Sequence, residues 1–366
     1  MKRLSGTIAC GAAAAALVLA LQAPASLAKE YLVGVGKPNQ MVLIDAAARK
    51  VERVFDIPGP GSPSSLVPSP DGKVAFVITN RWESISGIDL DSGDEVFRAD
   101  FSTGDMRVKG MFGMVVSRDG SELFVIQSSV KLKLGEYEVQ DTRVAVFDTG
   151  AGKGATPLRT FTIPRRSALL HLSTDGAKLY VVGWDIYVYD PKTGTQIETL
   201  PGMNWDRPNY YPPDIFGVWS QYEQAEVYAN PYFTLRSDMS MEDPAAWKTG
   251  MLTLDLKTGE LKTKDFENTE VIIFSAVVNP VRRNESYGVY TTLTKIDHEA
   301  GKVLKRVNLD HTYYSVNISG DGSEIYVGGT QNDVAVYSTD TLEKLGAINI
   351  PGGVDQGLLG VRVINR

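Results

Sequence analysis

Cysteine and histidine are scarce in this sequence, which has one cysteine, Cys10, and three histidines in 366 residues. Cys10 lies in an apolar stretch near the N-terminus, and no cysteine follows it. Residues 29–366 therefore cannot form a disulfide, a thiolate nucleophile, a cysteine-ligated metal site or a thioether-linked haem.

The three histidines are too dispersed to share one metal ion. His171 falls in a predicted inner strand, whereas His298 and His311 fall in connections on opposite faces of the predicted fold. This placement argues against a zinc site built on three histidines. Only His311, which follows Asp310, lies near the face with long connections, so a Ser-His-Asp triad has little support.

Long apolar runs are missing after the N-terminus. Lys2 and Arg3 precede an apolar run over residues 8–21, and Ser26 and Ala28 stand at positions −3 and −1 of a cleavage site. This pattern predicts a signal peptide over residues 1–28, cleaved near Ala28, and export to the periplasm. A short membrane anchor is the alternative, although the run is short for a membrane span.

Basic residues are outnumbered by acidic ones. Removal of Lys2 and Arg3 from the 37 Lys and Arg residues leaves 35 against 44 acidic residues, a net charge of −9. Such a chain has no basic excess with which to neutralise phosphates, so we expect no nucleic-acid partner.

What the chain does contain is a strand-and-turn pattern that repeats about seven times. Four Ser-x-Asp-Gly turns begin at Ser69, Ser117, Ser173 and Ser319. A second anchor, an Asp or Ser that ends a strand, recurs at Asp45, Asp89, Asp148, Asp190, Asp255, Asp297 and Ser338. Four of the six spacings between these anchors are 41–44 residues, and the other two contain insertions. A period of about 40–50 residues with short strands is typical of a β-propeller.

The termini predict how the ring closes. The first repeat lacks its inner strand, and the chain ends with an apolar strand over residues 357–365 that has no blade of its own. We therefore predict an all-β fold, a single domain over residues 29–366. It has seven blades of four antiparallel strands, with the C-terminal strand completing the N-terminal blade. A linear array of seven hairpin units would leave that strand without a partner.

Three insertions fall on one face of the predicted propeller. We name the strands of a blade A to D from inner to outer, and call the face with the D–A and B–C connections the loop face. The insertions span residues 128–142, 201–214 and 230–249, and the last two flank the fifth blade. They contain the candidate residues for a subunit interface or substrate pocket: Trp205, Tyr210, Tyr211, Asp214, Tyr232, Phe233 and Trp247. The alternative is that these side chains pack as a small core over one blade.

The opening stretch KEYLVGVGKPNQMVLIDAAARKVERVFDIP and the aromatic insertion before DIFGVWS carry a family resemblance. With the PSPDGK, SRDGSELFV and STDGAKLYVV turns, they resemble the beta subunit of bacterial quinohemoprotein amine dehydrogenase. The resemblance covers essentially the whole chain after residue 28. The turns alone are not specific, because many periplasmic propellers carry them.

The resemblance implies a periplasmic heterotrimer that oxidises primary amines to aldehydes and ammonia. An alpha subunit would carry c-type haems, and a small gamma subunit would carry cysteine tryptophylquinone. Electrons would pass through the haems to a small redox protein. The propeller would hold the quinone subunit and help to wall the amine pocket, with no covalently bound cofactor, metal or catalytic residue of its own. The isolated chain would then be inactive.

Two other functions are compatible with the residues. One is a self-sufficient propeller hydrolase of the lactonase type, which needs polar catalytic groups at the central channel. The other is a binding scaffold without catalytic activity. The scarcity of histidine and the apolar insertions disfavour the hydrolase.

Overall fold

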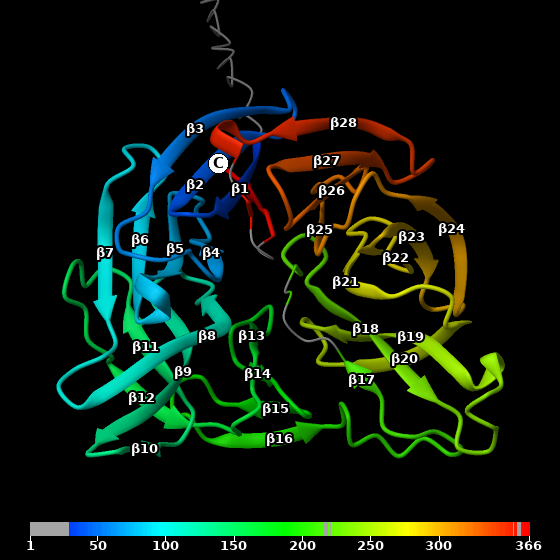
Figure 1. Ribbon diagram of the computed structural model, residues 1–366, viewed down its shortest axis with the longest axis horizontal. Coiled ribbons are helices and arrows are strands. Elements are labelled where there is room, and N and C mark those ends of the chain that lie inside the picture. The colour runs from blue at the N-terminus through cyan, green and yellow to red at the C-terminus, as the bar shows by residue number, and fades with distance from the viewer. Residues whose placement is uncertain (1–28, 216–218, 220, 354, 357–359) are drawn as a thin grey trace, which may run out of the picture.

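Seven β-sheets surround a central axis in the computed structural model, which describes residues 29–215, 219, 221–353, 355, 356 and 360–366 (Figure 1). Six sheets have four strands, and the sheet of blade 3 has a fifth. Neighbouring strands are antiparallel throughout. The predicted seven-bladed β-propeller is therefore confirmed. The predicted signal peptide lies outside the described residues.

The strands of each blade follow one another outward from the axis. Blades 1 to 3, inner strand first, consist of β29 (Arg362–Asn365), β1 (Glu30–Gly36), β2 (Gln40–Asp45) and β3 (Lys50–Asp56); β4 (Leu66–Pro68), β5 (Val74–Thr79), β6 (Ser84–Asp89) and β7 (Glu95–Asp100); and β8 (Met106–Val116), β9 (Glu122–Lys133), β11 (Arg143–Asp148) and β12 (Arg159–Thr162), with β10 (Glu136–Val139) beside β9. Blades 4 and 5 consist of β13 (Leu169–Leu172), β14 (Leu179–Val182), β15 (Ile186–Tyr189) and β16 (Gln196–Leu200); and β17 (Asp214–Ile215), β18 (Val227–Leu235), β19 (Trp247–Asp255) and β20 (Leu261–Asn268). Blades 6 and 7 consist of β21 (Ile273–Val278), β22 (Glu285–Tyr290), β23 (Thr292–Asp297) and β24 (Lys302–Asn308); and β25 (Ser315–Ile318), β26 (Glu324–Gly328), β27 (Asp333–Ser338) and β28 (Lys344–Asn349).

Helical structure among the described residues is limited to three short 3-10 segments, η1 (Asn80–Trp82), η2 (Pro244–Ala246) and η3 (Pro351–Gly353). Within the same residues, no helix has the length and apolarity needed to cross a membrane.

Burial follows the position of a strand in its blade. The middle strands are buried on both faces, as in β2 and β6, because each blade packs face to face against its two neighbours. The outer strands expose most of their side chains, as in β16. The hydrophobic core is therefore divided into clusters that lie between blades, such as the one that joins Phe76 and Phe97 of blade 2 to Phe147 of blade 3.

The C-terminal strand closes the ring as predicted. β29 pairs antiparallel with β1, so that Leu32 is opposite Val363 and Tyr31 is opposite Ile364. The backbone N–H of Lys29 also donates to the carbonyl oxygen of Arg366. Residues 357–359, part of the predicted strand, lie outside the described residues.

The Ser-x-Asp-Gly turns share one hydrogen-bond pattern. In the last of them, Ser319 Oγ donates to Asp321 Oδ1 at 2.6 Å and accepts the backbone N–H of Glu324 at 3.0 Å. Gly322 has a φ of 71°, a left-handed conformation that a glycine adopts without strain. The same serine–aspartate bond forms in the other three turns. The repeat is thus a local turn signal, which is why it is visible in the sequence.

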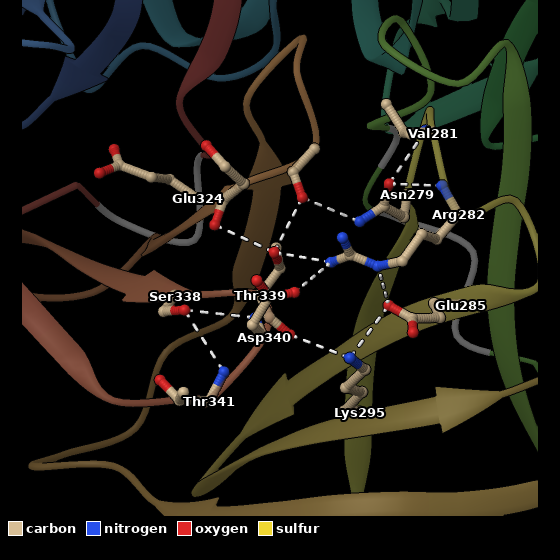
Figure 2. A network of polar contacts seen from close by, with 12 residues as sticks. Asn279, Val281, Arg282, Glu285, Lys295, Glu324, Ser338, Thr339, Asp340 and Thr341 are labelled. Atoms are coloured by element: carbon tan, nitrogen blue, oxygen red, sulfur yellow. Dashed lines mark hydrogen bonds and ion pairs between the residues drawn. The ribbon is translucent and has the colours of Figure 1, made fainter.

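Blade 6 uses a different turn, which fastens it to blade 7 (Figure 2). Asn279 Oδ1 accepts the backbone N–H groups of Val281 and Arg282, each at 2.9 Å. Arg282 Nη2 donates to Thr339 Oγ1 of blade 7 at 2.8 Å, and its Nε donates to Glu285 at 2.7 Å. The different turn of blade 6 is therefore accompanied by a hydrogen bond from Arg282 to blade 7.

The insertions over residues 128–142 and 230–249 consist largely of extended strands. β9 continues to Lys133 and turns back into β10 through Leu134 and Gly135, and β18 continues to Leu235. The side chains of β9 alternate in exposure beyond residue 128, which is the pattern of a strand that extends past its blade. Both insertions are thus largely hairpin extensions on the loop face.

Candidate functional site

The aromatic insertions of blade 5 form a small core around Asp265 on the outer strand β20. Tyr232 is fully buried, and its hydroxyl donates to Asp265 Oδ1 at 2.6 Å. Tyr210 donates to Asp265 Oδ2 at 2.8 Å, and Arg207 binds both carboxylate oxygens at 2.6 and 2.7 Å. Trp205 packs edge-on against Tyr232, with ring centroids 5.1 Å apart. These side chains fix the insertion to its own blade.

Electrostatics hold this core together. Burial alone would raise the pKa of Asp265, but the hydrogen bonds from Arg207, Tyr232 and Tyr210 outweigh it and keep that pKa below its ordinary value of 3.8. Burial and the neighbouring Asp265 carboxylate raise the pKa of Tyr232. The carboxylate is therefore ionised and the phenol is neutral at pH 7, as their hydrogen bond requires.

The other predicted residues of blade 5 lie around this core. Asp214 and Phe233 are opposite each other in the pairing of β17 with β18. Tyr211 and Trp247 are 51% and 41% exposed, and the Trp247 indole N–H donates to the carbonyl oxygen of Met241. Of the seven predicted residues, Tyr210 and Tyr232 thus meet on one carboxylate with Trp205 packed against their rings, while Tyr211 and Trp247 keep large exposed ring surfaces.

A second aromatic group lies nearer the axis and was not among the predicted candidates. We call Trp219, Phe274, Tyr290 and Tyr314 the axial aromatic cluster. The rings of Trp219, Phe274 and Tyr314 are stacked, with pairwise centroid distances of 5.1–5.9 Å and interplanar angles of 12–24°. Tyr290 is tilted against Phe274 at 4.1 Å. All four side chains are partly exposed.

The strands place this cluster at the loop-face end of the inner strands. Phe274 is the second residue of β21, and Tyr314 directly precedes β25; both inner strands run away from the loop face. Tyr290 is the last residue of β22, which runs toward it. The cluster thus joins blades 5, 6 and 7 at the loop-face end of their inner strands.

The repeat itself carried a signal for this cluster. Tyr314 lies five residues before Ser319, and Phe274 lies five residues before Asn279, the residue that replaces the serine in blade 6. Phe112 has the same offset from Ser117 in blade 3, and its ring is 6.0 Å from that of Trp82. Aligned blades would have shown aromatic residues at one inner-strand position.

The cluster offers binding surface rather than acid–base chemistry. Its only titratable groups are tyrosine hydroxyls, and burial and Tyr290 raise the pKa of Tyr314. Planar apolar groups stack on such rings, and an organic ammonium ion is attracted to their faces. The arrangement therefore suits an apolar or cationic organic ligand, or the side chains of a partner.

The histidines occupy three separate environments. His171 is fully buried against the rings of Tyr222 and Tyr228, and burial, with a contribution from Arg362 and Arg118, lowers its pKa to about 3. Within the described ranges, no three His, Cys, Asp or Glu side chains are grouped so that they could hold a metal ion.

His311 forms the one histidine–carboxylate pair near the loop face. Its Nε2 is 2.9 Å from Asp333 Oδ1, and Tyr313 donates to the same carboxylate at 2.5 Å. Asp310, its predicted neighbour, instead pairs with Lys344. The hydroxyl nearest the ring is that of Thr330, 3.4 Å from Nδ1, and it donates to a backbone carbonyl. This pair therefore lacks an activated nucleophile.

Comparisons with known proteins agree on the fold. No protein-family model matches the chain, and no curated protein is similar to it in sequence. Hydrazine synthase of Kuenenia stuttgartiensis is similar in structure, with a TM-score of 0.57, 14% identity, and coverage of 92% of this chain and 99% of that one. A protein of unknown function from Desulfotomaculum acetoxidans has a TM-score of 0.59, 8% identity, and coverage of 91% and 98%. Dihydro-heme d1 dehydrogenase NirN has a TM-score of 0.51, 13% identity, and coverage of 92% and 75%. At these identities the likeness extends to the propeller fold alone.

Proposed function

We propose that this chain is the propeller subunit of a periplasmic quinohemoprotein amine dehydrogenase. In this role it holds a small quinone-bearing subunit on its loop face, while a haem-bearing subunit carries electrons to a small redox protein. The family resemblance of the sequence suggests this role, and the axial aromatic cluster is the structural feature that carries it. Two of the similar structures are named hydrazine synthase and dihydro-heme d1 dehydrogenase, and they share the propeller fold that this role requires.

The chemistry of the chain suits a subunit without a redox centre. Cysteine tryptophylquinone and c-type haem both need a cysteine in the chain that bears them, and residues 29–366 contain none. When present on its own subunit, the quinone would supply the oxidation of the amine. The residues of this chain would bind the hydrocarbon part of the amine and exclude water from it.

The axial aromatic cluster gives this role a physical basis. Partly exposed, stacked rings from three blades lie together at the loop-face end of the inner strands, where a partner on the loop face would cover them. The ring faces also attract the substrate ammonium by cation–π interaction, worth about 0.5–2 kcal/mol. We therefore place the cluster, rather than the buried core around Asp265, on the approach of the amine.

Truncation of the cluster tests this role. In the purified complex, Phe274→Ala and Tyr314→Ala should each raise KM for phenethylamine about tenfold, because a lost aromatic contact of about 1.4 kcal/mol is a tenfold change in affinity. Steady-state kinetics with phenethylamine, and haem content per propeller, are the measurements.

Trp247→Ala is the matched control, because it removes an exposed ring of the predicted set from the outer side of blade 5. It should leave KM unchanged. If Trp247→Ala raises KM while both cluster variants keep the wild-type value, the amine approaches over blade 5 and the placement proposed here is wrong.

The hydrolase alternative has less support. His311 and Asp333 form the nearest approach to a catalytic pair, and no serine or threonine of the described residues completes it as an activated nucleophile. A hydrolase of this type would act as an isolated chain, whereas we expect the isolated chain to be inactive toward lactones and amines alike.

A further inference from the structure

Blade 3 extends beyond the propeller as a three-stranded flap. The first half of β8 pairs with the end of β9, and β9 turns back into β10 through Leu134 and Gly135. Across the three strands, Arg107 is opposite Val130, and Val130 is opposite Val139. Directly opposed residues of antiparallel strands point to the same face, so these three side chains share one face of the flap.

The face of the flap on the blade 2 side has its charges paired within the flap. Val108 is 2% exposed where the flap meets the blade. Farther out on this face, Lys131 pairs with Asp105 at 3.6 Å, and Lys133 pairs with Glu138 at 2.5 Å. The charges here are balanced within the flap itself and need no partner.

The opposite face, on the blade 4 side, is apolar and basic, and its charges are not balanced within the flap. Its side chains are those of Arg107, Lys109, Val130, Leu132, Tyr137 and Val139. Tyr137 and Val139 are 74% and 51% exposed, and Leu134 at the turn is fully exposed. Arg107 and Lys109 are exposed, and neither forms an ion pair with any described residue. An apolar strip is thus flanked by unpaired cations on a chain whose net charge is −7.

The outer strand of the flap also has a free edge. β10 pairs with β9 on one side, and no described strand pairs with its other side, at the periphery of the ring (Figure 1). Its outward N–H and C=O groups can pair with an added strand. Unpaired charges on Glu136 and Glu138 would discourage strand addition at this edge, but both side chains pair with Lys133 of β9.

More cations lie on the same side of the molecule. Arg143 begins β11 beside the flap, and Arg165 and Arg166 lie in the connection that enters blade 4 on the loop face. Arg143 donates to Gln127, and Arg166 lies over the ring of Trp184, so that none of the three pairs with a described carboxylate. This region thus favours an acidic occupant.

A second copy of this chain does not fit the flap. A two-fold pairing would set this face against an identical face that carries the same cations, Arg107 and Lys109. Two acidic chains also repel each other at long range. The occupant must therefore be a different chain that brings carboxylates to this face.

We propose that the face of the flap on the blade 4 side and the free edge of β10 dock an acidic, extended segment of a partner protein, which adds to β10 as a further strand. The side chains of Val130, Tyr137 and Val139 would cover the apolar positions of that segment, and Arg107 and Lys109 would pair with its carboxylates. The proposal rests on the part of the proposed function that gives this chain a partner, and not on the cofactor of that partner.

Site-specific photo-crosslinking tests the occupant. The full chain, with Tyr137→p-benzoylphenylalanine, is expressed in its own cells and irradiated before purification, and the crosslinked peptide is sequenced by mass spectrometry. We expect a single acidic peptide from another chain. Ile197, which is 57% exposed on the outer strand of blade 4, gives a control position at which no crosslink to that peptide should form.

Charge reversal supplies the second measurement. The double variant Arg107→Glu/Lys109→Glu should reduce the yield of this crosslink at least tenfold, and added salt should do the same for the wild-type chain. The matched control is Lys302→Glu/Lys305→Glu, which reverses two exposed lysines of β24 with the same change in net charge and should have no effect.

Three outcomes would overturn the docking proposal: a crosslink to a second copy of this chain, a crosslink to a peptide without acidic character, or no crosslink at all. Each can be distinguished from failure of the amine dehydrogenase proposal. That proposal fails when the crosslinked partner belongs to an assembly without haem, whether or not the acidic strand is found on β10.

Discussion

A chain that ends at Gly360 should fail to form the closed propeller. It lacks β29, which among the described strands is the one that joins the two ends of the ring. Val361, Val363 and Ile364 are at most 5% exposed, and burial of three such side chains contributes about 5–9 kcal/mol. This is of the same size as the whole stability of a typical domain, about 5–15 kcal/mol. The loss also exposes the inner edge of β1.

Urea denaturation followed by tryptophan fluorescence, with gel filtration, measures this effect. The truncated chain should be expanded or aggregated without denaturant. A chain that lacks only Arg366 should remain folded, because Arg366 pairs with Asp91 at the surface and adds no apolar side chain to the core. Val363→Ala should lower the free energy of unfolding by about 2 kcal/mol. This variant measures the contribution of β29 in a chain that still folds. A truncated chain as stable as the full one would mean that the blades are independent units.

Asp265→Asn should give the second large effect, a loss of about 2–3 kcal/mol in the free energy of unfolding. The amide keeps the size of the carboxylate but not its charge. The neutral amide therefore weakens the ion pair with Arg207. Its NH2 group also replaces one of the carboxylate oxygens that accept hydrogen bonds from Tyr210 and Tyr232 in the wild type. The estimate is below that of a fully buried pair because Arg207 and Asp265 are 29% and 18% exposed.

The contribution of Asp265 to the free energy of unfolding should depend on pH. The pKa of Asp265 is lower in the folded chain than its ordinary value of 3.8, so the carboxylate stabilises the fold above that value. This contribution is lost as the pH falls through the lowered pKa. The stability gap between wild type and Asp265→Asn should therefore be largest near pH 7 and shrink below pH 3.8.

Asp238→Asn is the control for this experiment. Asp238 also pairs with an arginine of the insertion, Arg236, but at the exposed surface, where an ion pair contributes little. Urea titrations at pH 7 and pH 3.5 should separate the two variants. A gap that stays constant with pH, or a similar loss for Asp238→Asn, would show that the Asp265 charge does not hold the insertion.

The scaffold could be predicted from the sequence because its signals are local. Each Ser-x-Asp-Gly turn is formed by residues within five positions of one another, as between Ser319 and Glu324. The ring closure could be predicted because a buried strand without a blade has only one free place. The repeat period therefore determines blade number without any knowledge of long-range contacts.

The candidate site could be predicted only in part because it depends on contacts between distant residues. Asp265 lies 58 residues after Arg207, and nothing in the local sequence marks it as the centre of the blade 5 core. The axial aromatic cluster joins three blades, and its rings meet only because the inner strands converge on the axis. Composition identified aromatic insertions, but not which rings face the solvent.

Purification of the native protein from its own cells tests its proposed role as a subunit of an amine dehydrogenase. The measurement is haem absorbance of the purified material, together with mass spectrometry of every chain that co-purifies. We expect this chain to elute with a haem-bearing chain and a small quinone-bearing chain, and we expect the assembly to oxidise primary amines. A chain that elutes alone, or in an assembly without haem absorbance, would contradict the proposed role.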